Sequence, residues 1–250
     1  MSNYLKQIYK CWHENPAQND SFEKYANDNG DFTKERQDLH NEIISNSVKR
    51  IRPNENFVIC FIGGPPAVGK SKFIDEKIGV KNKLIINTDE IKKLLPGYDS
   101  LGGSYLHRES FVIAEHILHK GLTLGLDVVI ETTGKGPYDL LINRINSIKL
   151  YGAIIDAHYL IAPLEILLQR ANARQVLINR HTPAGIIKNS LASIHNCLPR
   201  LIKSGVFNSI TVWDTEKDNC FVELLTKKND HAVIHDKKTW KALYGECINE

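Results

Sequence analysis

The chain has few cysteines for its 250 residues, and none of them forms a Cys-x-x-Cys pair. Their number is odd, and one of them lies inside an apolar run. These features argue against a disulfide scaffold and favour a reducing compartment. The five cysteines are Cys11, Cys60, Cys197, Cys220 and Cys247.

Long apolar runs are also missing. No stretch approaches the length that spans a membrane, and the first residues lack the apolar segment of a signal peptide. We therefore expect a protein that folds and acts in the cytoplasm and has no membrane partner. A bacterial protein exported by a dedicated secretion system would have the same sequence features.

A charge imbalance is absent as well. The sequence has 32 basic and 29 acidic residues, which gives a formal net charge of +3. Because nucleic-acid-binding domains are usually strongly basic, this balance argues against a nucleic-acid partner. The composition is 42% hydrophobic and 24% charged, as in ordinary globular proteins. The length suits one large domain, or one domain with a decorated end.

From residue 56 onwards, short apolar runs alternate with long helical patterns. The expected strands are Phe57–Ile62, Leu84–Asn87, Val128–Glu131, Ala153–Ile161 and Ile210–Trp213. The expected helices lie near 70–78, 89–94, 105–124, 137–148, 163–179 and 184–203, with a short terminal helix in 231–250 around Lys237–Tyr244. Strands that are apolar on both faces and alternate with helices predict a mostly parallel sheet covered on both sides. We therefore expect an α/β three-layer sandwich with ligands at the carboxyl ends of its strands.

The start of the chain has a different character. Apolar positions recur at helical spacing between Tyr4 and Trp12, and an Asn/Asp-rich stretch follows up to Gly30. This pattern predicts an N-terminal helical extension, residues 1–33, ahead of a main domain, residues 34–250. We expect an accessory helix that packs beside the sheet; a segment that covers the functional site in cis is the alternative.

The strongest motif is the run Gly64-Pro-Pro-Ala-Val-Gly-Lys-Ser71, which satisfies the pattern G-x-x-x-x-G-K-[ST] of a phosphate-binding P-loop. At ordinary residue usage, a chain of this length matches the pattern by chance roughly 1% of the time. The expected strand 57–62 leads into the run and a helix-competent segment follows it. The alternative is a turn rich in glycine and proline with an exposed lysine. The context favours a P-loop NTPase fold.

Each part of this motif has a role in binding ATP with Mg²⁺. Glycines let backbone N–H groups turn inward around a phosphate, and the helix that follows adds its positive end. Lys70 would contact the β- and γ-phosphates, while the Ser71 hydroxyl would be a ligand of Mg²⁺. The residues expected to bind ATP from the motif are Gly64, Pro65, Pro66, Ala67, Val68, Gly69, Lys70 and Ser71.

Acidic residues follow the next two expected strands. Asp89 comes just after the second strand, where its carboxylate could accept the proton of a substrate hydroxyl. The alternative is a helix N-cap at Asp89 or, better, at Thr88. Glu131 ends the third strand and could hold Mg²⁺ through water or bind the substrate; a solvated carboxylate is the alternative.

Three arginines lie within eleven residues of sequence: Arg170, Arg174 and Arg180. Such residues could close over the γ-phosphate as a lid and neutralise the charge that spreads over its oxygens in the transition state. A solvated basic helix face is the alternative.

Taken in order, these motifs resemble the zeta toxin family, bacterial P-loop kinases that phosphorylate a hydroxyl of UDP-N-acetylglucosamine. The resemblance covers roughly residues 30 to 215. The matching segments are Phe32-Thr-Lys-Glu-Arg36-Gln-Asp-Leu-His40, the P-loop, Asn87-Thr-Asp89, Leu95-Pro-Gly-Tyr98, Glu115, Glu131-Thr-Thr133 and Arg180-His-Thr-Pro183.

The resemblance implies a role for each matching residue. The implied roles are ATP and Mg²⁺ binding for Lys70 and Ser71, general base for Asp89, sugar-nucleotide binding for Glu115, Glu131 and Thr133, and a phosphate clamp for Arg180 with Arg170. A neutralising antitoxin is the partner that the resemblance implies.

Two other functions stay open. Relatives of this family phosphorylate other hydroxyls, so a P-loop kinase that acts on NAD, a nucleoside or a nucleic-acid end is one alternative. A regulatory switch that hydrolyses a nucleotide to change shape is the other. The chain lacks the Asn-Lys-x-Asp motif of a GTPase after a later strand, and it has one acid at Glu131 where a motor ATPase would have two.

Overall fold

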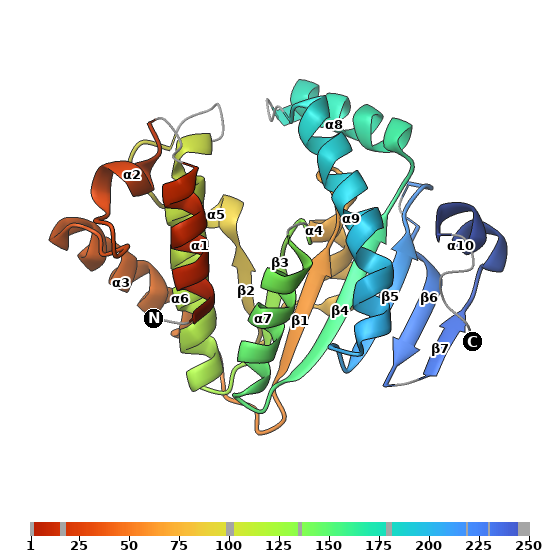
Figure 1. Ribbon diagram of the computed structural model, residues 1–250, viewed down its shortest axis with the longest axis horizontal. Coiled ribbons are helices and arrows are strands. Elements are labelled where there is room, and N and C mark those ends of the chain that lie inside the picture. The colour runs from red at the N-terminus through yellow and green to blue at the C-terminus, as the bar shows by residue number, and fades with distance from the viewer. Residues whose placement is uncertain are drawn as a thin grey trace. The chain divides into compact units, whose positions relative to one another are not determined.

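The computed structural model describes residues 3–15, 19–98, 103–134, 137–178, 182–218, 220–229 and 231–244 (Figure 1). The helices are α1 (Asn3–Glu14), α2 (Ser21–Tyr25), α3 (Lys34–Val48), α4 (Lys70–Phe73), α5 (Thr88–Lys92), α6 (His107–Thr123), α7 (Tyr138–Lys149), α8 (Leu164–Ile178), α9 (Ala184–Ser204) and α10 (Lys237–Tyr244). The strands are β1 (Val58–Gly63), β2 (Leu84–Asn87), β3 (Val128–Glu131), β4 (Ile154–Ile161), β5 (Ser209–Asp214), β6 (Val222–Lys228) and β7 (His231–Ile234). Within these residues, no helix is both long and apolar enough to cross a membrane.

The seven strands form one sheet in the order β2-β3-β1-β4-β5-β6-β7. β4 pairs in parallel with both β1 and β5, whereas β6 pairs antiparallel with β5 and β7. The predicted fold class, an α/β P-loop sandwich with a mostly parallel sheet, is confirmed. The contacts divide the chain into two compact units, residues 1–57 with 82–128 and residues 58–81 with 129–250, which we call the first and second units.

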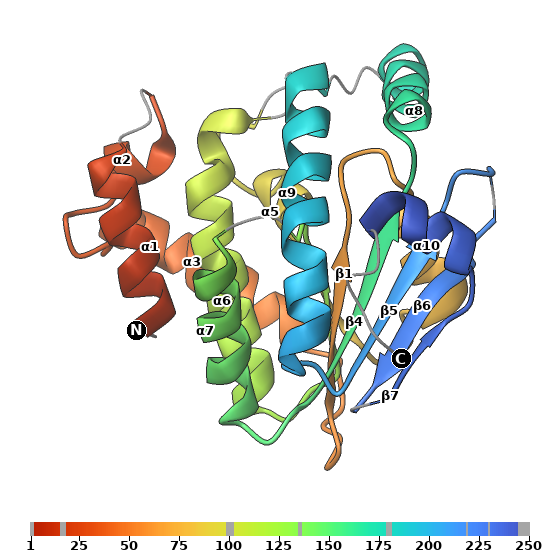
Figure 2. The same ribbon diagram turned by 45° about the vertical axis from the view of Figure 1, so that its right-hand side comes forward.

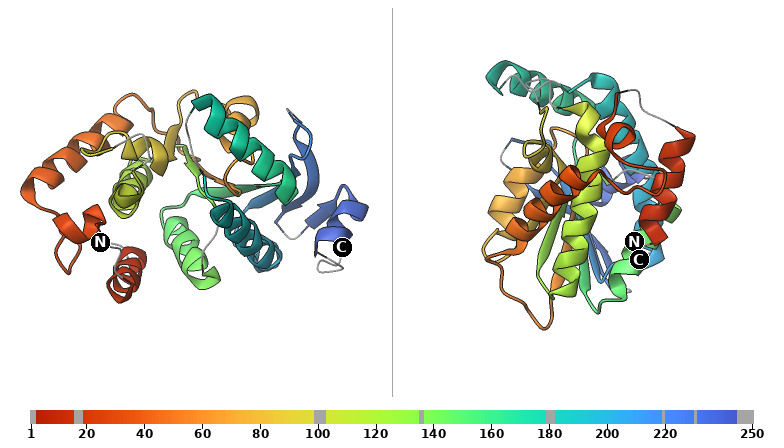
Figure 3. Two further views of the ribbon diagram at one scale, coloured as in Figure 1. Left: turned by 90° about the horizontal axis from the view of Figure 1, so that it is seen from above. Right: turned by 90° about the vertical axis from the view of Figure 1, so that its left-hand side faces the viewer.

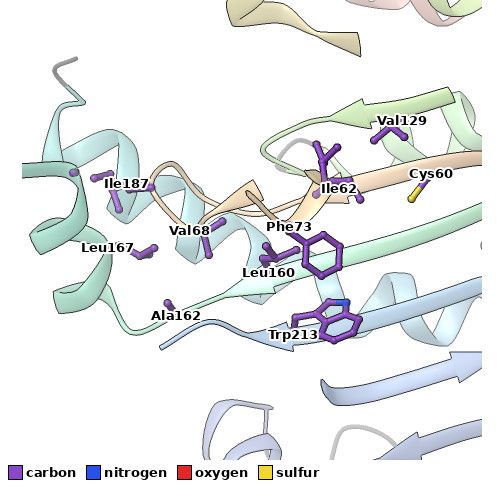
Figure 4. Packing of buried hydrophobic residues seen from close by; sticks show 13 residues of the cluster. Cys60, Ile62, Val68, Phe73, Val129, Leu160, Ala162, Leu167, Ile187 and Trp213 are labelled. Carbon is purple, nitrogen blue, oxygen red and sulfur yellow. The ribbon is translucent and has the colours of Figure 1, made fainter. Parts of the chain in front are cut away.

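The second unit is layered. Figures 2 and 3 show α7 and α9 on one face of β1, β4 and β5, with α4 on the other face. Its core lies directly beneath the end of β1, as Figure 4 shows for Val68, Leu160, Leu167 and Ile187. Burying an aliphatic side chain of this size stabilises the fold by about 2 kcal/mol. The loop that follows β1 is therefore part of the hydrophobic core.

The first unit is built around α6. The buried residues Leu5 and Tyr9 of α1 form a cluster with Phe22, Phe32 and Val112, and Val112 lies on α6. The ring of Phe22 lies 5.2 Å from that of Tyr9 and 5.7 Å from that of Phe32. The predicted amphipathic helix at the start of the chain is confirmed, and its apolar side packs on α6. The domain boundary at residue 33 stays a prediction.

A buried ionic cluster ties α3 to α6. Glu109 is fully buried, and its Oε1 lies 2.8 Å from His40 Nε2 and 3.4 Å from Arg36 Nη1. Burial by itself raises the pKa of Glu109, but the hydrogen bond with His40 and the charge of Arg36 outweigh it, so the pKa lies below its ordinary value. The helical spacing of Arg36 and His40 thus brings both side chains to one carboxylate.

Most predicted elements are confirmed within one or two residues at each end. The helix expected over 70–78 starts as α4 and continues as a π-helical turn, Ile74–Ile78. The terminal helix is α10, with the predicted bounds. The expectation for 231–250 was wrong for residues 231–234, which form β7, and β6 was missed as well. These two strands form an antiparallel hairpin that extends the sheet past β5.

We expect Glu109→Gln to lower the free energy of unfolding by about 3 kcal/mol, because it leaves the buried Arg36 without its countercharge. Urea denaturation measures the effect. Glu42→Gln, at an exposed glutamate of α3, is the matched control and should change stability by less than about 0.5 kcal/mol. Equal effects of the two substitutions would contradict a stabilising role for the cluster.

The same cluster predicts a pH dependence. Because folding lowers the pKa of Glu109, the unfolded chain binds more protons than the folded chain as pH falls below the ordinary glutamate pKa of about 4.3. The contribution of Glu109 is therefore complete above that pH and is lost as pH falls through the folded pKa. Urea titrations that run from neutral pH to pH values well below about 4.3 should show a smaller loss of stability for Glu109→Gln than for the unmodified chain.

Candidate active site

The P-loop lies between β1 and α4. β1 ends at Gly63, and α4 begins at Lys70 with Gly69 as its N-cap in the left-handed region, at φ 99°. The predicted strand–turn–helix context of the motif is confirmed. An added Cβ at Gly69 would meet no atom within 4 Å, so glycine is needed there for its backbone angle and not for space.

The apolar residues of the loop anchor it to the core. Val68 is 1% exposed and Ala67 8% exposed, and Ala67 has the positive φ of 67° that is uncommon for a residue with a side chain. Gly64 passes so close to β4 that an added Cβ would lie 2.8 Å from the Leu160 carbonyl oxygen. Because the side chains point into the core, the backbone of the loop is held in one conformation.

The polar residues of the motif follow directly. Lys70 Nζ donates hydrogen bonds to the carbonyl oxygens of Gly64 and Pro65, at 3.0 and 3.2 Å. Its ammonium group therefore lies over the loop that the motif forms. Ser71 Oγ donates to Glu131 Oε2 at 3.3 Å. The structure thus brings Glu131, at the end of β3, to the P-loop serine.

The segment after β3 lies against the first turn of the loop. The Gly64 N–H donates to the Thr133 carbonyl oxygen at 3.3 Å, and Thr132 Oγ1 accepts from the Gly134 N–H. Tyr159 of β4, which is 2% exposed, fills the space between Gly63 and Gly134. An added Cβ would lie 2.6 Å from its ring at Gly63 and 2.7 Å at Gly134. This ring sets the spacing between the P-loop and the segment that carries Glu131.

Arg170 binds the loop that follows β5. Its Nη2 donates to the Thr215 carbonyl oxygen at 2.7 Å and to Asp218 Oδ1 at 2.8 Å. Thr215 Oγ1 in turn donates to the Val68 carbonyl oxygen at 3.1 Å. The arginine therefore fixes the loop after β5, and that loop holds the P-loop backbone. Thr215 and Asp218 follow β5, and no sequence motif marks either residue.

Asp89 and Glu115 belong to the first unit. Asn87, at the end of β2, is the N-cap of α5, because its Oδ1 accepts from the Asp89 N–H at 2.8 Å. The alternative interpretation, a cap at Asp89 or Thr88, was therefore wrong. The Asp89 carboxylate instead pairs with Lys92, 3.0 Å away. Glu115 lies on α6 and is 8% exposed, so it is not the solvated helix glutamate that is usual.

The structure thus brings Lys70, Ser71, Glu131 and Thr133 together in the second unit, and it holds Arg170 at the loop after β5. Arg180 lies outside the described residues.

The two glycines Gly134 and Gly152 test the role of Tyr159. Both have left-handed backbone angles, φ 65° and 78°, but an added Cβ would strike Tyr159 only at Gly134 and would meet nothing at Gly152. Each alanine substitution costs about 1 kcal/mol in backbone strain. We expect Gly134→Ala to cost a further 1–3 kcal/mol, about the usual price of overpacking a core. Urea denaturation of both variants measures the difference; equal losses would show that the ring yields freely.

Solved structures with the same fold include complexes from two systems. The AvrRxo1-ORF1:AvrRxo1-ORF2 complex with sulphate ions is similar with a TM-score of 0.65 and 17% identity, over 86% of this chain and 74% of that chain. The AvrRxo1-ORF1:-ORF2 structure with ATP gives the same values. The PezAT chromosomal toxin–antitoxin system of Streptococcus pneumoniae gives a TM-score of 0.63 and 16% identity, over 86% and 90%. At these identities the likeness shows the fold alone.

Sequence comparisons give the family. A search of the curated proteins found no match. The family model for the zeta toxin matches residues 43–239, which is more than half of the chain and includes the P-loop, Asp89, Glu115 and Glu131. The resemblance stated from the motifs is thereby confirmed, and the chain belongs to the zeta toxin family.

Proposed function

We propose that the protein is an ATP-dependent phosphotransferase that moves the γ-phosphate of ATP to an alcohol group of a small molecule. The first candidate acceptor is UDP-N-acetylglucosamine or a similar sugar nucleotide. The contact between Ser71 Oγ and Glu131 Oε2, 3.3 Å apart beside Lys70, carries the proposal, because it joins the phosphate cradle to an acid at the end of the neighbouring strand. Membership of the zeta toxin family supports a phosphotransferase.

ATP would bind along residues 64–71. The core holds the side chains of Ala67 and Val68, so backbone N–H groups of the loop are free of obstruction by side chains on their phosphate side. Lys70 would exchange its bonds to the Gly64 and Pro65 carbonyl oxygens for phosphate oxygens. The AvrRxo1 complex solved with ATP supports this choice of nucleotide by analogy.

The residues at the P-loop fit Mg²⁺. This cation prefers hard oxygen ligands, usually one or two protein groups with water and phosphate oxygens. The Ser71 hydroxyl and the Glu131 carboxylate provide such a pair within one site. When bound, Mg²⁺ would neutralise charge on the β- and γ-phosphates.

Asp89 would act as the general base. Its carboxylate would accept the proton of the acceptor hydroxyl while that oxygen forms a bond to the γ-phosphorus and ADP leaves. Asn87 is the N-cap of α5, so the Asp89 carboxylate is not needed as a cap. Lys92, which is 7% exposed, orients the Asp89 carboxylate through an ion pair of 3.0 Å.

Arg170 and Arg180 would clamp the phosphates in the transition state. For Arg170 this requires an exchange of its ion pair with Asp218. The Asp218 side chain is 83% exposed, and an exposed ion pair contributes at most about 1 kcal/mol, so phosphate oxygens can compete for the guanidinium group.

Glu115, Glu131 and Thr133 would bind the acceptor. The buried position of Glu115 suits a carboxylate that binds a substrate hydroxyl group or amide away from water. A neutralising antitoxin is the protein partner we expect, by analogy with the toxin–antitoxin system among the structural neighbours.

The first test of the activity uses two lysines of the same helix. Lys70→Ala should lower phosphate transfer about 100-fold or more, because it removes a cation from the transferring phosphate. Lys72→Ala, which removes a lysine that pairs with Glu76 and is 41% exposed, should leave transfer within about twofold. Mass spectrometry would detect the gain of one phosphate in a panel of UDP-sugars, NAD, nucleosides and nucleic-acid 5′ ends incubated with Mg-ATP.

The acceptor panel also discriminates between the functions. Modification of a compound outside the UDP-sugars would replace the sugar-nucleotide acceptor and keep the kinase. Fast ATP hydrolysis that no acceptor consumes, and that Lys70→Ala abolishes, would instead identify a nucleotide-hydrolysing switch.

The second test addresses the base. Asp89→Asn should lower kcat about 1000-fold, because an amide cannot take the proton, with little change in the KM for ATP. Glu90→Gln is the matched control, since Glu90 is the neighbouring acid of α5 and pairs with the exposed Lys93. Loss of kcat in both variants, or in neither, would remove Asp89 from the mechanism. Circular dichroism would verify that both variants fold.

A further inference from the structure

The first unit contains a cavity of about 340 Å³ that the P-loop chemistry does not use. Its lining comes from the start of the chain, from α3, and from the segments on either side of residues 99–102. The lining residues are Asn19, Ser21, Lys24, Tyr25, Arg36, Pro96, Gly97, Tyr105 and Leu106. Small-molecule pockets have volumes from about 300 Å³ upwards, so this cavity is large enough to hold one.

The charge of the lining has one sign. Lys24 and Arg36 contribute cations, and no aspartate or glutamate is among the described residues that line the cavity. The two cations meet at Tyr25: the Arg36 guanidinium carbon lies 4.2 Å from the centre of its ring and Lys24 Nζ lies 5.0 Å away. Hydrogen bonds from Lys24 and Arg36 lower the pKa of the Tyr25 hydroxyl, as a site that favours negative charge should do.

Arg36 forms an ion pair with Glu109 and also lines the cavity. It is 8% exposed, and its Nη1 is enclosed by protein 3.4 Å from Glu109 Oε1, so any contact with a ligand comes from the rest of the guanidinium group. A guanidinium group has five N–H donors, and a buried donor without an acceptor costs about 1–3 kcal/mol. An anionic oxygen in the cavity would be bound by charge-assisted hydrogen bonds from the N–H groups of Arg36 that line it.

Tyr105 also lines the cavity, and a hydrogen bond orients its ring. The Tyr105 hydroxyl donates to the Gly97 carbonyl oxygen, which joins the turn after α5 to the start of α6. With Tyr25, Tyr105 gives the cavity two ring surfaces beside its two cations. This combination suits a small molecule that carries a phosphate on an apolar or planar body.

More than half of the residues that line the cavity precede the match to the family model, although Arg36, Pro96 and Gly97 lie in segments that resemble the family. Five of the nine lining residues precede residue 43, where the match to the family begins. All nine lie in the first unit, whereas the P-loop lies in the second.

We propose that this cavity is a second ligand pocket, in which Lys24 and Arg36 bind the phosphate group of a small molecule and Tyr25 and Tyr105 contact its body.

The test uses inorganic pyrophosphate as the probe and isothermal titration calorimetry as the measurement. The full-length Lys70→Ala chain is the starting protein, because it lacks the P-loop cation that would also attract the probe. Adding Lys24→Glu should weaken pyrophosphate binding about fivefold or more, since it reverses a charge of the pocket. Lys49→Glu is the matched control: it makes the same charge change at an exposed residue, about 20 Å along α3 from Arg36.

The outcomes distinguish binding in the pocket from a general attraction of pyrophosphate to the positive charge of the protein. A loss confined to Lys24→Glu supports the pocket. Equal losses with Lys24→Glu and Lys49→Glu, or the absence of pyrophosphate binding by the Lys70→Ala chain, would overturn it. Lys24 is exposed, so the substitution leaves the core intact, and a thermal melt of each variant verifies this. Neither result depends on kinase activity, so failure of the pocket and failure of the proposed function are distinguishable.

Discussion

The site depends on the way the hydrophobic core holds the P-loop. Val68 inserts its side chain among Leu160, Leu167 and Ile187, and its carbonyl oxygen accepts a hydrogen bond from Thr215. Because the loop is anchored at this middle residue, its conformation is set before any phosphate arrives. The positive φ of Ala67 is the strain that this anchoring maintains. A preformed cradle of this kind lowers the entropic cost of binding a flexible triphosphate.

Core packing also brings Glu131 close to the P-loop. Tyr159 separates Gly63 from Gly134, and neither position tolerates a Cβ, so one buried ring spaces the end of β1 from the segment after β3. The Ser71–Glu131 contact then follows from the strand order, because β3 and β1 are neighbours in the sheet. Arg170 contributes indirectly. It binds Thr215 and Asp218 and so stabilises the loop that holds Val68. A residue expected at the phosphates thus contributes to the shape of their binding loop.

Sequence patterns predicted the elements whose side chains are uniform in character. β1, β3 and β5 are apolar on both faces, and the P-loop has a motif that requires a strand before it and a helix after it. β6 was missed because Val222 and Glu223 are exposed and its end is basic, so it lacks a continuous apolar run. Its pairing with β7 depends on tertiary context. The N-cap at Asn87 was misassigned because three neighbouring polar residues can all cap a helix, and only the backbone geometry chooses among them. Nothing in the sequence marks Glu109 as a buried ion, since its partners lie about 70 residues earlier.

The N-terminal segment lies close to Glu115, although it precedes the part of the chain that the family model matches. Tyr9 packs with Val112 of α6, and Glu115 lies three residues further along that helix, on the same face. Burial, Asp31 and Glu115 together raise the pKa of Tyr9 to about 12, so the Glu115 carboxylate lies within electrostatic reach of the extension. The carboxylate that the family resemblance assigns to the acceptor is therefore partly enclosed by residues that the family match does not include.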